Sequence, residues 1–185
     1  MKFELVEEPM LGLKLIKRQC AGDERGYFSR LYCEKALGEF GWPSEVAQSN
    51  FSKTNAVGAI RGLHFQYPPD AEAKLVTCVS GAVFDVAVDL RKGSSTFGRW
   101  FGTELSAKNQ MSLLVPKGFA HGFQALESDS MLVYFASCAY APENESGVIW
   151  NDKDLAIDWP LPPSTISARD QEMPPLKSIG DGIKV

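Results

Sequence analysis

The 185-residue sequence lacks a basic surplus, since 19 lysines and arginines stand against 23 aspartates and glutamates, for a net charge of −4. General nucleic-acid binders usually carry such a surplus, so the composition argues against that class. The longest hydrophobic run, MLVYFASCAYA, is too short to span a membrane, and the N-terminal MKFELVEEPML has no apolar signal-peptide core. We therefore expect a cytoplasmic protein with no nucleic-acid and no membrane partner.

Cysteine and histidine are also scarce. The four cysteines are widely spaced and form no CxxC pair, which favours reduced, packed thiols over a disulfide framework or a zinc site. The chain has no internal repeat, no GxGxxG motif and no P-loop, so nothing points to a nucleotide redox cofactor. Only two histidines, His64 and His121, are available for chemistry.

The sequence does contain many short, strand-like segments separated by Gly, Pro, Asn and Asp. Their close spacing from residue 46 onward, with no long helical periodicity, predicts an all-β sandwich or barrel in one domain. EKALGEFGW is expected to form a short helix, and YFSRLYC a strand. After residue 140, prolines, acidic residues and two tryptophans predict an irregular segment packed over the β unit, and the final KSIGDGIKV is expected to fray.

One strand carries an acidic residue in an unusual place. In AVFDVAVDLR, alternation puts Asp85 on the same face as Val83 and Ala87. Asp85 therefore faces either solvent or a polar cavity, and a barrel that encloses a ligand cavity makes the second arrangement possible.

Both histidines lie in apolar, glycine-bounded segments, RGLHFQ and PKGFAHGF. Each could be an ordinary packed histidine, but the matching contexts favour a shared site. The spacing of Gly58 to His64, and the segment PKGFAH, resemble the two half-motifs of the cupin barrel. Metal-binding cupins usually have a second His two residues after the first, where this chain has Gln66, and Asp70 lies in a predicted turn. A metal-free site fits better, and it leaves His64 free to act as a base.

Three further residues have both a structural and a functional interpretation. Lys74 is either a solvent-exposed lysine at the start of a strand or a cation that stabilises an oxyanion. Tyr134 either packs in the core or reaches a cavity as a general acid. Asp170 is either a surface charge or a carboxylate that orients His64.

Several long motifs occur in order: GDERGYF, QSNFS, RGLHFQ, KLVTCVSGAVFDVAVDLRKGSSTFGRW, VPKGFAHGF, SGVIWNDKDLAIDWP and SARD. Together they resemble the dTDP-4-dehydrorhamnose 3,5-epimerase family over about residues 10–175. The resemblance implies a single domain over residues 1–185, folded as a cupin-type double-stranded β-helix (jelly roll) with short helices. It also implies a homodimer with no metal and no cofactor, whose substrate is a nucleotide-linked 4-keto-6-deoxy sugar.

The resemblance further assigns roles to residues. It implies that His64 abstracts a proton, that Asp170 pairs with His64, that Lys74 steadies the enolate oxygen at C4, and that Tyr134 is the opposing acid. The C3 and C5 protons are both α to the C4 ketone, so a base, an acid and an oxyanion donor suit their inversion. The positions implied to contact the substrate are Arg25, Phe28, Gln48, Ser49, Asn50, Arg61, His121, Tyr140, Glu145 and Arg169.

Two residues depart from the family pattern. Arg30 stands where an acidic residue is expected, and Ser49 stands where an aspartate is expected. A CDP- or GDP-linked substrate, or inversion at C3 or C5 alone, therefore remains an alternative. A metal-dependent cupin enzyme is disfavoured by the shortage of histidines. A non-catalytic sugar-binding cupin is disfavoured because binding alone requires no base, acid and oxyanion cation together.

Overall fold

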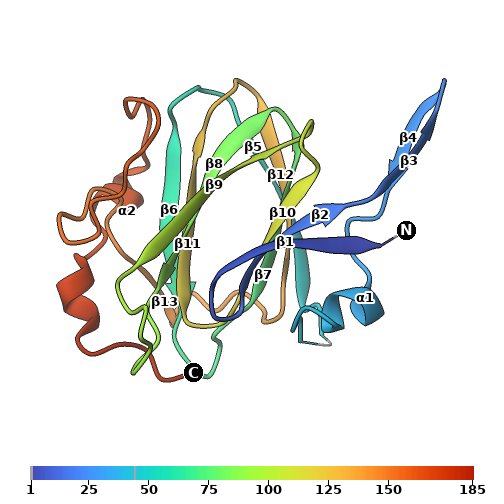
Figure 1. The fold of residues 1–185 in the computed structure, drawn as a ribbon. Coiled ribbons are helices and arrows are strands. Elements are labelled where there is room, and N and C mark those ends of the chain that lie inside the picture. Colours follow the sequence, from blue (N-terminus) through green and yellow to red (C-terminus); the bar gives the residue numbers. More distant parts are fainter. Residues whose placement is uncertain (1, 44) are drawn as a thin grey trace.

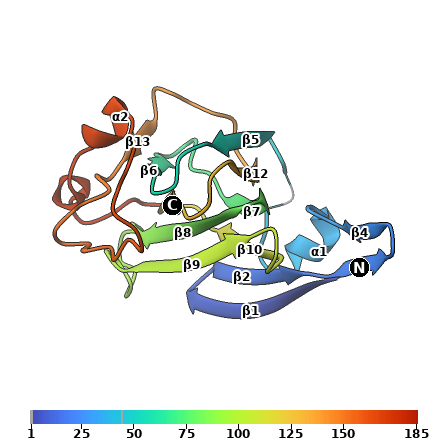
Figure 2. The ribbon, with the colours of Figure 1, turned by 90° about the horizontal axis from the view of Figure 1, so that it is seen from above.

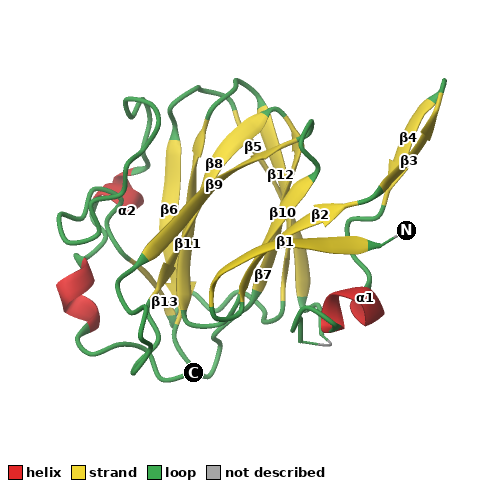
Figure 3. Ribbon diagram, viewed as in Figure 1, coloured by secondary structure: helices red, strands yellow, loops and turns green. Residues whose placement is uncertain are grey.

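The computed structural model describes residues 2–43 and 45–185, which fold mainly into two antiparallel β-sheets that face each other (Figures 1 and 3). The six-stranded sheet has the order β1 (Phe3–Met10), β2 (Leu13–Arg18), β10 (Met111–Val115), β7 (Lys74–Ser80), β12 (Ser130–Ala136) and β5 (Gln48–Thr54). The five-stranded sheet has the order β13 (Glu145–Gly147), β6 (Ile60–Gln66), β11 (Phe119–Ala125), β8 (Ala82–Asp89) and β9 (Trp100–Ser106). This double-sheet arrangement is that of a jelly roll, and the all-β prediction is confirmed.

Strand alternation builds a separate core on each side of the five-stranded sheet. On β8, Val83 and Ala87 point between the sheets, where they pack in one cluster with Phe123 of β11 and Leu132 of β12. The opposite face of the same sheet presents a second apolar surface, which includes Val86. Because successive side chains of a strand point to opposite faces, only every second residue of β8 can reach an internal cavity.

The C-terminal segment covers the outer face of the five-stranded sheet, on the side opposite to the short helix α1 (Glu34–Gly38) (Figure 2). It contains α2 (Ala168–Gln171) and the 3₁₀ helix η1 (Leu176–Ile179). The indole N–H of Trp100 donates to the Leu155 carbonyl at 3.0 Å, which ties this segment to β9. It is largely irregular, as predicted.

The end of this segment differs from expectation. Ile183 is only 3% exposed, and its N–H donates to the Leu90 carbonyl at 2.7 Å. The prediction that the final residues fray is therefore wrong as far as Ile183. The buried side chain of Ile183 and its backbone hydrogen bond to Leu90 hold this part of the chain against the sheet.

At the other side of the molecule, α1 packs against the six-stranded sheet through Leu37, which is fully buried beside Ile16 and Leu75. The short helix expected in EKALGEFGW is thus confirmed. Strand β1 was not predicted, because its residues are mostly exposed, include three glutamates and pair only with β2 at the edge of the sheet.

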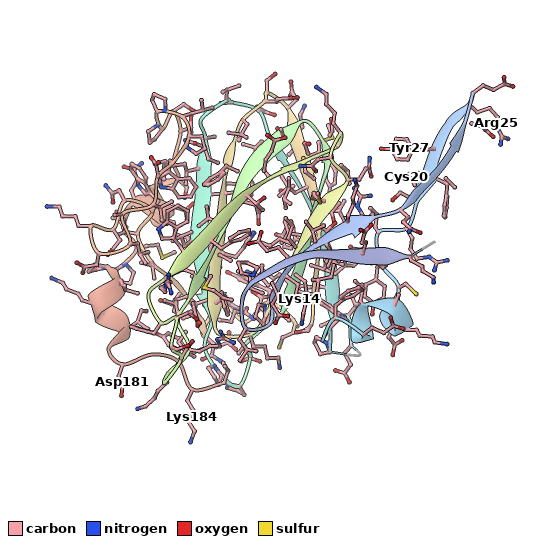
Figure 4. The ribbon with its side chains drawn as sticks, in the orientation of Figure 1. Lys14, Cys20, Arg25, Tyr27, Asp181 and Lys184 are labelled. Carbon is pink, nitrogen blue, oxygen red and sulfur yellow. The ribbon has the colours of Figure 1, made fainter. Side chains whose placement is uncertain are left out.

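The hairpin of β3 (Cys20–Asp23) and β4 (Gly26–Ser29) projects away from the body of the molecule, with Arg25 at its tip (Figures 1 and 4). The strand expected over YFSRLYC ends at Ser29, in this hairpin. No helix within the described ranges is long and apolar enough to cross a membrane.

A buried carboxylate fixes the turn after β8. Asp89 is fully buried and accepts hydrogen bonds from Arg91 Nε at 2.9 Å and from the hydroxyls of Ser94 and Thr96, both at 2.6 Å. Burial alone would raise the pKa of Asp89, but the hydrogen bonds from these three residues outweigh it and lower the pKa to about 2.

We expect Asp89→Asn to lower the free energy of unfolding by about 3 kcal/mol at pH 7, because an amide cannot replace a carboxylate in this network. Because folding lowers the pKa of Asp89, its contribution is present above the ordinary value of 3.8 and is lost as the pH falls toward 2. About 1 kcal/mol of the wild-type advantage should already be lost at pH 3. Urea unfolding at both pH values measures this, and an equal difference at the two would contradict it.

Candidate active site

A cavity of about 690 Å³ lies between the two sheets. Its walls come from β5, β6, β7, β11 and β12 and from the C-terminal segment around α2. The predicted site residues that line it are Arg61, His64, Lys74, His121, Tyr134, Arg169 and Asp170. The structure therefore brings together the four residues predicted to be catalytic and three of those predicted to bind substrate.

The two histidines are neighbours because β6 and β11 approach each other closely. His64 lies opposite His121 in the antiparallel pairing of these strands. A Cβ atom on Gly122 would come within 2.6 Å of the Arg61 carbonyl oxygen, and one on Gly62 within 2.7 Å of the Gly122 Cα. Only glycine fits at both positions, so the glycines of RGLHFQ and FAHGF permit the approach that pairs the histidines.

His64 is held by a carboxylate from the C-terminal segment. Asp170 Oδ1 lies 2.7 Å from His64 Nε2, and Asp170 Oδ2 accepts the Gly62 N–H at 3.2 Å. The Ser167 hydroxyl caps α2 by accepting the Asp170 N–H at 3.1 Å. Burial would raise the pKa of Asp170, but the bonds from His64, Gly62 and Ser167 outweigh it and lower that pKa. The carboxylate therefore stays ionised and can stabilise a protonated imidazole.

His121 has a carboxylate partner of its own. Both oxygens of Asp85 lie within 3.0 Å of His121 Nε2, and Asp85 is fully buried. Of the two environments that strand alternation allowed for Asp85, the structure shows the polar interior.

Lys74 and Tyr134 lie close together because of the register between β7 and β12. Lys74 is opposite Ala136, and Tyr134 is opposite Val76, so Lys74 and Tyr134 are diagonal neighbours on the face toward the cavity. The Lys74 side chain is only 13% exposed, and its Nζ lies 2.9 Å from a carboxylate oxygen of Glu72. Lys74 is thus not the solvent-exposed lysine of the alternative interpretation.

The pKa of Tyr134 is raised, first by burial and then by the negative charges of Glu72 and Glu145, against the opposing effect of Arg61. Its phenol therefore stays protonated over a wide pH range and remains able to donate a proton.

Arg61 is anchored to the edge strand β5. Its Nε donates to the Thr54 hydroxyl at 3.0 Å, and its terminal nitrogen donates to the Lys53 carbonyl at 3.1 Å. Because the guanidinium lines the cavity without a carboxylate partner at these contacts, it can bind an anionic group of a ligand.

A chain of hydrogen bonds joins further predicted residues to Arg169 of the cavity wall. Arg169 forms an ion pair with Glu145, and the Tyr140 hydroxyl donates to Glu145 at 2.6 Å. The Tyr140 N–H donates to Gln48 Oε1 at 2.8 Å, and Gln48 Nε2 donates to Asn50 Oδ1 at 3.3 Å. Five predicted substrate contacts are thus coupled in one network.

Three predicted residues lie elsewhere in this chain. Ser49 is exposed on the face of β5 opposite to Gln48 and Asn50, so it points away from the cavity. Arg25 and Phe28 belong to the projecting hairpin, where Phe28 is 60% exposed and Arg25 pairs with Asp23.

Sequence reasoning missed Glu72, although its spacing of two residues from Lys74 was a usable signal for side chains on one face of an extended segment. It also missed the pairing of Asp85 with His121, because strand alternation gives a face and not a partner. Within residues 2–43 and 45–185, no three His, Cys, Asp or Glu side chains cluster as a metal site would require. Metal-free catalysis stays a prediction that metal analysis of the purified protein would test.

A jelly roll whose cavity holds a carboxylate-paired histidine, a lysine and a tyrosine defines a cupin-type protein with side chains suited to acid–base chemistry. The family model described as dTDP-4-dehydrorhamnose 3,5-epimerase matches residues 7–178. The chain therefore belongs to the dTDP-4-dehydrorhamnose 3,5-epimerase family, and it is an isomerase.

Relatives agree with this assignment. The dTDP-4-dehydrorhamnose 3,5-epimerase of Shigella flexneri is 46% identical over 150 residues, which are 80% of this chain and 82% of that protein. The Bacillus anthracis enzyme, solved with TDP and PPi bound, is 43% identical with a TM-score of 0.91, over 94% of this chain and 99% of that one. The Legionella pneumophila enzyme, solved with dTDP-4-keto-L-rhamnose, is 37% identical with a TM-score of 0.93, over 99% and 98%. The family resemblance and the cupin-type fold predicted from the sequence are confirmed.

We expect Gly122→Ala to lower the free energy of unfolding by about 1–3 kcal/mol, because the new methyl group would force β6 and β11 apart. Thermal and urea unfolding measure the change. Gly38→Ala is the matched control, since nothing lies within 4 Å of a Cβ at that helical position, and it should not destabilise the protein. An unfolding free energy for Gly122→Ala equal to that of the wild type would show that the strands tolerate a wider spacing.

Proposed function

We propose that this protein inverts C3 and C5 of dTDP-4-keto-6-deoxyglucose to give dTDP-4-dehydrorhamnose. The observation that carries the proposal is that one cavity is lined by a carboxylate-paired base, His64, a cation, Lys74, and a protonated acid, Tyr134. The activities of the relatives supply the substrate class.

The reaction needs only proton movements. His64 takes the proton from C3 or C5, and the electron pair of that C–H bond moves into an enolate whose charge lies on the C4 oxygen. The ammonium of Lys74 stabilises this oxyanion, and Asp170 stabilises the imidazolium formed at His64. Tyr134 then donates a proton to the same carbon from the opposite face, which inverts the centre.

The remaining cavity residues suit the nucleotide end of the substrate. Arg61 offers a guanidinium held in place by Thr54, and the similar Bacillus anthracis structure contains TDP and PPi. We assign Arg61 to the diphosphate for this reason. The rim network from Arg169 to Asn50 supplies amides, a phenol and a carboxylate for hydroxyl and base groups.

The test is solvent deuterium uptake by dTDP-4-keto-6-deoxyglucose, followed by NMR at C3 and C5 separately. Wild-type protein should exchange both positions. His64→Ala should slow exchange by at least about a hundredfold, whereas Tyr134→Phe should retain exchange but impair inversion. Tyr67→Phe is a matched control, since this partly exposed tyrosine lies outside the cavity wall, and it should behave as wild type.

The other outcomes separate the alternatives. Exchange at one carbon only would identify a mono-epimerase, and faster exchange with CDP- or GDP-linked sugars would overturn the dTDP assignment. Binding without any exchange would identify a sugar-binding cupin. Stoichiometric metal, with exchange lost on chelation, would identify a metal-dependent enzyme.

We also propose that the protein is a cytoplasmic homodimer in which the β3–β4 hairpin reaches the partner's cavity. The four cysteines are free thiols, which suits a reducing compartment. Within one chain Arg25 lies at the tip of the projecting hairpin (Figure 4), and Phe28 belongs to β4 of the same hairpin, although the family resemblance makes both residues substrate contacts. A projecting hairpin can still contact substrate if a second copy of the chain, related by twofold symmetry, supplies the cavity that Arg25 and Phe28 line.

Mixing two inactive variants tests the shared site. His64→Ala lacks the base and Phe28→Ala weakens the hairpin contact, so each alone should have low exchange activity. A heterodimer of the two has one intact site, and random exchange of subunits should restore about a quarter of the wild-type activity. No recovery in samples in which differently tagged subunits co-purify as mixed dimers would show that the hairpin does not complete the partner's site.

A further inference from the structure

We propose that Glu72 is a positioning residue for epimerisation, which holds the ammonium of Lys74 at one place in the cavity. This inference rests on the proposed function and deepens it, since it names a group that acts through Lys74 and does not touch the substrate itself. Glu72 lies outside the cavity wall, whereas Lys74 and Tyr134 belong to it.

The contact has the properties of a built site. The Glu72 carboxylate is 2.9 Å from Lys74 Nζ, and the two side chains are 12% and 13% exposed. The neighbours Ala71 and Ala73 are 4% and 5% exposed, so the carboxylate is fixed in a well-buried backbone segment. An exposed Lys–Glu contact contributes little, but a largely buried one restricts both side chains to one arrangement.

A lysine needs such a restraint to act as an oxyanion donor. Its ammonium sits on a flexible four-carbon stem, and stabilisation of an enolate depends on donors that are in place before the charge develops. The ammonium has three N–H donors, so one bond to Glu72 leaves two for the C4 oxygen and for a neighbouring acceptor. Glu72 thus supplies the orientation, and Lys74 supplies the charge.

The same carboxylate acts on the proposed acid. After burial, the negative charge of Glu72 is the largest cause of the raised pKa of Tyr134. Removing that charge therefore lowers this pKa, and the phenol loses its proton at lower pH. The other charged or titratable groups that line the cavity with Tyr134 or act on its pKa are Lys53 on β5, Arg61 and His64 on β6, Lys74 on β7, His121 on β11, Glu145 on β13, and Arg169 and Asp170 on α2.

The experiment compares Glu72→Ala and Glu72→Gln with wild type in the deuterium-exchange assay, over a range of substrate concentration and pH. Glu72→Ala should lower kcat by about 10–100-fold, because a misplaced ammonium no longer meets the C4 oxygen, while KM changes by less than about threefold. Glu72→Gln keeps an acceptor for Lys74 and should recover much of the loss. In both variants the alkaline limb of the rate profile should move to lower pH, because both remove the negative charge beside Tyr134.

The control is Glu127→Gln. Glu127 faces Lys108 at 4.0 Å on the surface, with side chains 52% and 90% exposed, and its replacement should leave kcat and the pH profile unchanged. A merely structural role for Glu72 would lower the melting temperature without moving the pH profile of the folded fraction, and that result would overturn the proposal.

A measurement without substrate separates this inference from the proposed function. The side-chain ¹⁵N signal of Lys74, assigned with Lys74→Met, should be protected from exchange in the wild type and lost in Glu72→Ala. Wild-type protein that shows this signal but no deuterium uptake would refute the proposed function alone. Wild-type protein that exchanges, with Glu72→Ala and Glu72→Gln equal to it in kcat and pH profile, would refute the role of Glu72.

Discussion

The cavity between the sheets encloses charged side chains, and a charge removed from water is tolerated only with a partner. The pairs of His64 with Asp170, His121 with Asp85 and Lys74 with Glu72 meet this requirement with separations between 2.7 and 3.0 Å. Each pair restricts the rotamers of the side chain that faces the cavity. The requirement for pairing therefore makes the site rigid before any ligand arrives, and rigid donors are those that stabilise a developing oxyanion most effectively.

Asp170, the partner of His64, belongs to the largely irregular C-terminal segment. Buried polar groups hold this segment in place. The Asp152 carboxylate accepts backbone N–H groups of Leu155 at 3.0 Å and Leu176 at 2.8 Å, and Gln124 of β11 donates to the Leu161 carbonyl at 2.8 Å. These hydrogen bonds satisfy backbone groups that strand pairing would otherwise have satisfied. The position of Asp170 consequently depends on packing against the outer face of the five-stranded sheet as much as on α2 itself.

Alternation and glycine spacing allowed the sequence to predict the all-β fold, a site shared by the two histidines, and the division of β8 into two faces, although not which of them lines the cavity. The sequence could not reveal β1, whose mostly exposed residues lack an apolar face, or the ordered tail, whose anchor is the single side chain of Ile183. The residues left Asp170 open between a surface charge and a partner of His64, and only the family resemblance implied the pairing, because no local pattern connects two residues 106 positions apart. Glu72 was missed for a different reason, since an acidic residue before a strand is common, and its spacing of two residues from Lys74 indicates a shared face but not a contact between the side chains.

The separation of His64 from Asp170 also has a consequence during synthesis. At about 5–20 residues per second, roughly 5–20 s pass between the emergence of the histidine and that of its carboxylate partner. The strands that form the walls of the cavity are complete by Gly147, so they are all synthesised before Asp170 is available to pair with His64. The pairing of His64 with Asp170 can therefore form only after the strands of both sheets have been synthesised.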